Sequence, residues 1–194
     1  MSSAAVPAER RVARPNGWWG MAVFVATEAT LFGTMIGSYF YLRFRAEHWP
    51  PVGIEAPKLT LPLVLTGVLV ATVIPVAIAV SSTRRGLRRR ALIALLVSLV
   101  VQTGYLAMQI HLFLHDVHRF SPHDSAYASI YFTLLGAHHF HVAVAILLEG
   151  WLLVRLAGGL TRYRLVALEA VAFYVYFVAV LALIVVGVQL SAAA

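Results

Sequence analysis

The order of apolar and polar residues along the chain predicts five membrane-spanning helices. Five apolar stretches, each close to or longer than the ~20 residues that cross a bilayer, alternate with short segments rich in Arg, Pro, Gly or His. The predicted spans are residues 18–42, 61–82, 91–114, 126–153 and 165–190. The predicted fold class is therefore an all-α, polytopic membrane helix bundle over residues 17–191, preceded by a polar N-terminal tail over residues 1–16.

Proline positions predict where this pattern is interrupted. Three prolines lie between the first two spans and indicate an ordered loop with little helix, because Pro biases the preceding residue away from helical geometry. Pro75 lies well inside the second span and lacks a backbone donor, so we expect a kink near residues 71–74. A His-rich segment around Pro122 predicts an interfacial helix end followed by a turn.

Composition supports the membrane class and excludes others. The chain has 194 residues, of which 61% are hydrophobic and 12% charged, unlike a soluble domain. It has no Cys, which excludes disulfides, thiolate metal sites and Cys nucleophiles. The net charge of +7 comes from Arg residues in short loops beside apolar spans, which is typical of membrane topology rather than of nucleic-acid binding.

The distribution of positive charge predicts the orientation of the bundle. Eleven Lys and Arg residues lie on the side of the N-terminus and four on the opposite side. Because cytoplasmic loops carry an excess of positive charge, we expect a cytoplasmic N-terminus and an external C-terminus. The first span is too long and too polar at its centre for a signal peptide, so we expect no cleavage.

The first span carries one ionisable residue near its middle. Glu28 lies ten residues after Trp18, which corresponds to ~15 Å of helix and places it near the bilayer midplane. A charge at that depth is costly, and intramembrane acids usually face protein, water or a partner. Glu28 is therefore either a functional or partner-binding residue, or a protonated, hydrogen-bonded acid that only packs.

Small residues form a stripe on the other side of this span. Ala22, Ala26, Gly33 and Gly37 follow one another at helical spacing, and the last two form a GxxxG motif. Such stripes let helix backbones approach closely in membranes. We therefore expect this face to line a tight helix contact.

Two histidines of the fourth span reach the depth of Glu28. His138 and His141 lie 12 and 15 residues after Ala126, or about 18 and 22 Å inward from the opposite membrane face. Either imidazole can then meet the Glu28 carboxyl and share its proton. The alternative is that each histidine bonds a backbone or Thr oxygen within the bundle.

Other polar groups predict weaker sites. Gln102 lies at mid-depth in the third span. The spacing of His111, His115 and His118 would place them on one helix face, but interfacial histidines are usually solvated and we expect no metal there. Charged residues near the expected cytoplasmic ends of the last two spans form either an interfacial ion network or a cradle for anionic headgroups, or they only mark topology with snorkelling side chains; they are Glu149, Arg155, Arg162, Arg164 and Glu169.

Together, these segments resemble subunit III of the haem-copper oxidases, the family of cytochrome c oxidase and quinol oxidase. The family's span with Trp-Gly-Met, Ser/Thr-Glu and Tyr-Phe-Tyr-Leu-Arg is similar to WWGMAVFVATEATLFGTMIGSYFYLR. Its span with Tyr-Phe and Thr-Gly-x-His-Gly-x-His-Val is similar to SIYFTLLGAHHFHVAVAILL, and its last helix to EAVAFYVYFVAVLALIVVG. Gln102 sits where the family often has Gln, and Arg155 matches a basic residue that faces lipid phosphate.

The chain also departs from the family pattern. The family's seven-helix form has two further helices at its start, so we expect the five-helix form here. Residues that differ from the usual ones are His139 for Gly, Leu135 for Thr, Tyr105 for an acid, Tyr176 for His and Ala179 for Asp.

The resemblance implies an accessory, non-redox subunit of a respiratory terminal oxidase with no catalytic residue of its own. It would bind the catalytic subunit I, with subunits II and IV as further partners, and it would bind phospholipid. Its role would be to stabilise the catalytic subunit, to order the surrounding lipid, and to support proton uptake and oxygen access. Haem and copper would belong to the partner subunits, and the complex to the plasma membrane of a prokaryote. The residues implied in proton or lipid contacts are Glu28, His138, His141, Gln102 and Arg155.

Two other functions fit some of the same residues. An ion- or proton-coupled transporter would use Glu28 and the mid-depth histidines as its ion site, but it is typically built from inverted repeats and the sequence shows no repeat. A haem-bearing membrane anchor would need facing axial histidines on two helices, whereas mid-depth histidines occur in one span.

Overall fold

The described residues form a bundle of long helices. The computed structural model describes residues 15–54 and 60–193. Its helices are α1 (Asn16–Arg45), α2 (Thr60–Ala71), α3 (Val73–Arg84), α4 (Arg88–Arg119), α5 (Ala126–Ala157) and α6 (Arg162–Ala193). With α2 and α3 taken as one span, five helical stretches of the described chain are long and apolar enough to cross a membrane. The predicted all-α class and number of spans are confirmed, while nearly all of the predicted N-terminal tail lies outside the described residues.

The helices extend beyond the predicted spans. α4 continues to Arg119, and α5 begins at Ala126 as predicted but continues to Ala157. Ser125 caps the start of α5, since its hydroxyl accepts a hydrogen bond from the backbone N–H of Ala128 at 3.1 Å. The apolar pattern marks only the length needed to cross hydrocarbon, about 20 residues, and α4 and α5, at 32 residues each, are longer than that.

The second span is broken where the sequence predicts a kink. α2 ends at Ala71 and α3 begins at Val73. Between them, the N–H and the hydroxyl of Thr72 both donate to the carbonyl of Leu69, three residues earlier, at 3.0 and 2.6 Å. Pro75 lacks the N–H that would bond to the carbonyl of Ala71 in a continuous helix. The second span is therefore interrupted within the region where the sequence predicts a kink.

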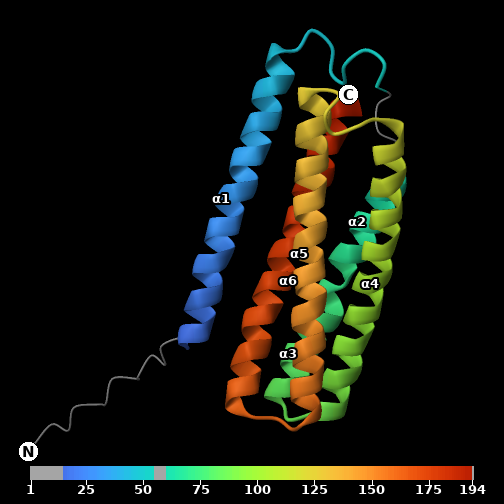
Figure 1. Cartoon of the computed structure of the whole chain (residues 1–194). Coiled ribbons are helices and arrows are strands. Elements are labelled where there is room, and N and C mark those ends of the chain that lie inside the picture. The colour runs from blue at the N-terminus through green and yellow to red at the C-terminus, as the bar shows by residue number, and fades with distance from the viewer. Residues whose placement is uncertain (1–14, 55–59, 194) are drawn as a thin grey trace, which may run out of the picture.

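α6 lies at the centre of the bundle and α1 at its edge. α6 contacts α1, α2, α3 and α5, whereas α1 contacts α5 and α6. The start of α1 and the C-terminal end of α6 lie at opposite ends of the bundle (Figure 1). The turns after α3 and α5 lie at the end where α1 starts (Figure 1). An odd number of spans accounts for this arrangement.

Aromatic side chains hold the other end of the bundle together. Phe32 and Tyr39 are the buried side chains of α1, and they pack with Tyr127 of α5 in one core cluster. Trp49, in the loop after α1, places its ring 5.3 Å from that of Tyr39 and 4.9 Å from that of Tyr127. Its Nε1 donates to the Tyr39 hydroxyl at 3.0 Å. The loop is thus ordered over residues 46–54, and residues 55–59 lie outside the described part.

Candidate functional site

Half-buried Glu28 of α1 and buried His141 of α5 form a pair between the two helices. Nε2 of His141 lies 2.9 Å from Oε2 of Glu28. The His141 side chain is 7% exposed and the Glu28 side chain 19%. The other ring nitrogen, Nδ1, lies 2.7 Å from the Ala137 carbonyl oxygen, one turn earlier in α5. The predicted contact between Glu28 and a histidine of the fourth span is present for His141.

The two hydrogen bonds of His141 determine how many protons the pair holds. A carbonyl oxygen only accepts hydrogen bonds, so Nδ1 carries a proton that points to Ala137. The contact with Glu28 then contains one proton: either a protonated Glu28 donates to neutral imidazole, or an imidazolium donates to carboxylate. Both forms have zero net charge, which lowers the cost of placing the pair in a membrane. The pair can therefore hold one proton and move it between carboxyl and imidazole.

Aromatic rings surround the pair, and a groove leads to it. The Phe32 ring meets the His141 ring edge-on at 5.1 Å, and the Tyr174 hydroxyl donates to the His141 carbonyl at 3.3 Å. A groove of about 700 Å³ runs between α1 and α5. Its lining is Glu28, His141, Tyr174 and mostly apolar side chains such as Phe24 and Phe132. The walls of the groove are thus mostly apolar around one polar pair.

His138 belongs to a different group of side chains. Its Nε2 lies 3.2 Å from the Tyr105 hydroxyl on α4, and that hydroxyl accepts a hydrogen bond from Nε2 of Gln109 at 3.2 Å. Because the Gln109 amide nitrogen only donates, the Tyr105 hydrogen points to His138. Of the two histidines that the sequence leaves open as partners of Glu28, His138 is therefore not the one, since its imidazole contacts α4 rather than α1.

Gln102 also lies away from the Glu28 pair, and it binds a second acid. It is 1% exposed, and its Nε2 donates to Oε1 of Glu149 at 2.7 Å. Ser98, one turn earlier on α4, donates to the same oxygen at 3.1 Å. From the sequence, Glu149 belongs either to an ion network or headgroup cradle at the membrane face or to the snorkelling side chains that mark topology; in the structure it is instead buried against α4. Glu149 is 1% exposed and lies between α4 and α5.

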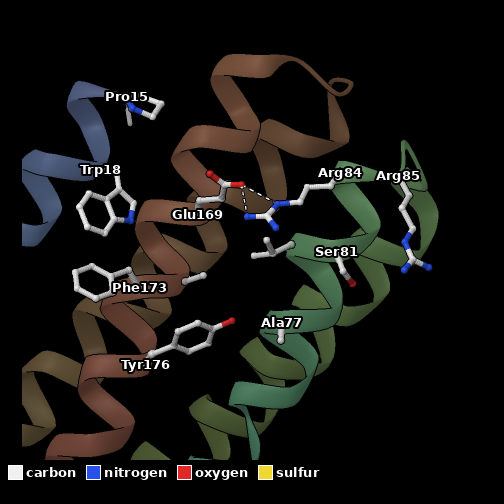
Figure 2. A pocket seen from close by; sticks show the side chains of 11 residues that line it. Pro15, Trp18, Ala77, Ser81, Arg84, Arg85, Glu169, Phe173 and Tyr176 are labelled. Carbon is white, nitrogen blue, oxygen red and sulfur yellow. Dashed lines mark hydrogen bonds and ion pairs between the residues drawn. The ribbon is translucent and has the colours of Figure 1, made fainter. Parts of the chain in front are cut away.

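The charged end of the bundle contains one ion pair across helices and a pocket (Figure 2). Nη2 of Arg84 on α3 lies 2.8 Å from Oε1 of Glu169 on α6. The pocket, of about 770 Å³, is also lined by Trp18 and Phe173, whose rings stack at 5.6 Å. Arg85 points away from the ion pair (Figure 2). Since Arg84 is 62% exposed, the pair contributes about 0–1 kcal/mol to stability.

The network predicted among Glu149, Arg155, Arg162, Arg164 and Glu169 is not formed as such. Glu169 pairs with Arg84 instead, and Arg164 donates to the Gly159 carbonyl at 2.7 Å. The Arg155 guanidinium lies over the Trp151 ring, 5.2 Å from its centroid. These basic groups are satisfied by carbonyls and rings as well as by carboxylates, which the sequence pattern does not distinguish.

The small-residue stripe of α1 is not covered by another helix of the described chain. Ala26, Gly33 and Gly37 are exposed, and a methyl group added at either glycine would meet nothing within 4 Å. Hydroxyl groups near the stripe are bonded to the helix itself; Thr30, for example, donates to the Ala26 carbonyl at 3.0 Å. This face can therefore lie in lipid without unsatisfied groups. The predicted tight contact is not made within the described residues and stays a prediction for a helix of another subunit.

The outer histidines do lie along one continuous helix, since α4 extends to Arg119. His111, His115 and His118 are all exposed. Over residues 15–54 and 60–193, no three His, Asp or Glu side chains are grouped closely enough to hold a metal ion. The nearby Asp116 accepts a hydrogen bond from the Tyr131 hydroxyl at 2.8 Å.

Comparison with known proteins places the chain in a family. A family model described as cytochrome c oxidase subunit III matches residues 9–189. The chain belongs to the cytochrome c oxidase subunit III family. It is therefore a multi-pass membrane subunit of a haem-copper terminal oxidase, and such a complex contains partner subunits.

Relatives of this subunit III come from both branches of the family. Subunit 3 of the cytochrome bo(3) ubiquinol oxidase of Pseudomonas aeruginosa is 29% identical over 76% of this chain and 69% of the relative. Quinol oxidase subunit 3 of Bacillus subtilis is 29% identical over 72% of this chain and 67% of the relative. Cytochrome c oxidase subunit 3 of Papio hamadryas is 28% identical over 84% of this chain and 64% of the relative. The chain thus spans about two thirds of the length of these proteins.

Gln102 of this subunit III is among the site residues predicted from the sequence, but the polar face of α4 to which it belongs is not. Ser98, Gln102, Tyr105 and Gln109 recur on α4 at steps of four, three and four, which places them on one helix face. All four are buried against α5. The signal was this helical spacing of polar groups within an apolar span, which indicates a polar interface between two helices.

Proposed function

We propose that this subunit III is an accessory, non-redox subunit that stabilises the catalytic subunit of its oxidase, orders lipid at its surface, and supports proton uptake and oxygen access during aerobic electron transport. The electron donor of the complex is cytochrome c or a quinol. The partners are the catalytic subunit I together with subunits II and IV. The observation that carries the proposal is the Glu28–His141 pair on the wall of a groove in a chain of this family.

The Glu28–His141 pair supports a role of this subunit in proton supply, without a catalytic or redox reaction at the pair itself. It holds one proton in a neutral unit, 2.9 Å from donor to acceptor, and no nucleophile or redox group lies beside it among the lining residues. The groove suits an acyl chain because its walls are apolar. A lipid seated there would exclude water from the pair and would connect proton exchange to the order of the surrounding lipid.

Arg155 supports lipid binding at the other end of α5. It is exposed at the last turn of the helix and rests on Trp151, which is 42% exposed. Trp and Arg together are typical of the headgroup layer, where the ring lies in the interface and the charge meets phosphate. Phospholipid is therefore the ligand that we assign to this subunit.

Redox cofactors belong to the partner subunits in this proposal. Haem would need axial side chains at matching depth on facing helices. In the described part of the chain the mid-depth histidines all lie on α5, where His141 bonds Glu28 and His138 bonds Tyr105. Haem and copper are thus assigned to the partners.

The positive-charge bias supports an orientation with the N-terminus in the cytoplasm of a prokaryote. The turn after α3 and the turn after α5 lie at the end of the bundle where α1 begins (Figure 1). The Arg residues around them, from Arg84 to Arg90 and from Arg155 to Arg164, would then lie at the cytoplasmic face of the plasma membrane.

The test compares the oxidase complex with and without this subunit. We expect initial oxygen consumption to stay near normal when the subunit is absent, because no redox group is lost, while activity decays sooner during continuous turnover. Adding the subunit back should restore the turnover lifetime. An equal lifetime in both preparations, or an immediate loss of electron transfer with an intact catalytic subunit, would contradict the accessory role.

A further inference from the structure

The α4–α5 interface contains a buried carboxyl that takes no part in the Glu28 site. Oε1 of Glu149 accepts hydrogen bonds from Nε2 of Gln102 at 2.7 Å and from Oγ of Ser98 at 3.1 Å. Nε2 of Gln102 also donates to Oγ of Ser98 at 2.9 Å. Glu149 and Gln102 are each 1% exposed. The three side chains thus form one unit that is closed to solvent.

Two oxygen atoms of this unit have no hydrogen-bond partner. They are Oε2 of Glu149 and Oε1 of Gln102, and they belong to side chains that are already joined through their other atoms. With an ionised Glu149 both atoms are acceptors, so neither can satisfy the other. Buried polar atoms without a partner are rare and unfavourable, so an ionised unit would carry two such defects on two side chains that are bonded to each other.

An ionised Glu149 would also lack a counter-charge. Its partners in the described structure are an amide and a hydroxyl, and no ion pair joins it to a basic side chain of residues 15–54 or 60–193. It lies six residues before Arg155 on α5, about 9 Å further into the span by helix rise. A carboxylate without a cation at such depth is strongly disfavoured.

We propose that Glu149 is a proton-binding site, in which the carboxyl carries a proton on Oε2 and donates it to Oε1 of Gln102. One proton turns one of the two unpartnered acceptors into a donor, so it satisfies both atoms at once. The result is a neutral acid–amide pair with two parallel hydrogen bonds between α4 and α5. Exchanging the oxygen and nitrogen positions of the Gln102 amide leads to the same conclusion, because the pair still needs one proton on the acid.

This proton is distinct from the one shared by Glu28 and His141. Glu149 bonds side chains of α4, whereas Glu28 lies on α1 and bonds α5. The Glu149 proton acts as a bound ligand of the α4–α5 interface, since without it the contact would contain two unpartnered acceptors and a charge. Ser98 orients the amide by accepting its second N–H.

Infrared spectroscopy of the purified oxidase complex tests the proposal, with Glu149→Gln and the matched control Glu28→Gln. A protonated carboxyl has a C=O stretching band that is separate from carboxylate bands and shifts in heavy water. We expect the wild-type minus Glu149→Gln difference spectrum to contain such a band, and the Glu28→Gln complex to retain it. A difference spectrum with carboxylate bands in place of the acid band would overturn the proposal.

The stability of the same variants gives a second, independent result. In Glu149→Gln an N–H replaces the O–H donor, so the complex should retain subunit III on heating as long as wild type does. Glu149→Leu keeps much of the volume but removes the hydrogen bonds, and it should shorten that retention several-fold. If Glu149→Gln lost the subunit as quickly as Glu149→Leu, the site would require the carboxylate charge and the proposal would be wrong.

Discussion

Replacing Glu28 by Ala removes the carboxyl that lies 2.9 Å from Nε2 of His141. The imidazole remains in place because Nδ1 is still bonded to the Ala137 carbonyl at 2.7 Å, and its side chain is only 7% exposed. A buried polar atom that loses its partner costs about 1–3 kcal/mol, which corresponds to a factor of about 5–150 in an equilibrium. Glu28→Gln keeps the size and a hydrogen-bonding group, so it should fall nearer wild type.

Two readouts on the purified complex check this prediction. The first is retention of subunit III after heating, which should fall in Glu28→Ala and much less in Glu28→Gln. The second readout is oxygen consumption, measured both as an initial rate and as the lifetime of activity during turnover. We expect a near-normal initial rate in both variants, and a shorter lifetime or slower proton uptake in Glu28→Ala. Because Gln can hydrogen-bond but cannot hold the shared proton, the comparison separates the structural contribution of Glu28 from its proton.

Two outcomes would refute the reasoning. An immediate loss of electron transfer in an intact Glu28→Ala complex would give Glu28 a catalytic role that this account does not contain. Wild-type retention and wild-type lifetime in both variants would show that the contact with His141 contributes nothing measurable, and Glu28 would then be an acid that only packs.

Two further predictions concern surfaces of the bundle. Gly33→Leu should leave the fold of this subunit intact, because the position is open within the described chain. It should weaken assembly of the complex, because the predicted contact of the stripe is with a helix of another subunit. Unchanged subunit stoichiometry and thermal stability of the complex would show that the stripe makes no such contact. The isolated subunit should contain less than one Zn or Cu per chain by elemental analysis, whereas about one metal ion that disappears in a His111/His115/His118 triple Ala variant would contradict this.

The number of spans and the break in the second one follow from local features of the sequence. Apolar length predicts a membrane span whatever surrounds it, and Pro75 interrupts a helix because it lacks a donor. That Glu28 contacts a histidine of α5 could also be predicted from the sequence, because helix rise converts a count of residues into depth in the membrane. Depth does not give direction around the helix axis, however, so it could not tell that His141 faces α1 while His138 faces α4.

Glu149 shows what the sequence pattern leaves out. Glu149 lies near the end of an apolar span, six residues before Arg155. Charged side chains near span ends usually reach the membrane interface, so the sequence predicts a Glu149 carboxylate at the membrane surface. Its burial depends on the angular position of α5 against α4, where Gln102 and Ser98 provide donors. Which side chains of neighbouring helices contact one another depends on how the helices pack, and neither hydropathy nor residue spacing along one helix predicts it.

The central claim is that this chain works as a non-redox subunit of a haem-copper oxidase, and co-purification tests it most directly. The tagged chain would be isolated from membranes in mild detergent, its partners identified, and visible spectra recorded for the complex and for the separated subunit. The account predicts large haem-containing partners, a Soret band in the complex, and none in the separated chain. A Soret band in the separated chain, or its isolation as a stable single protein without oxidase partners, would contradict the account.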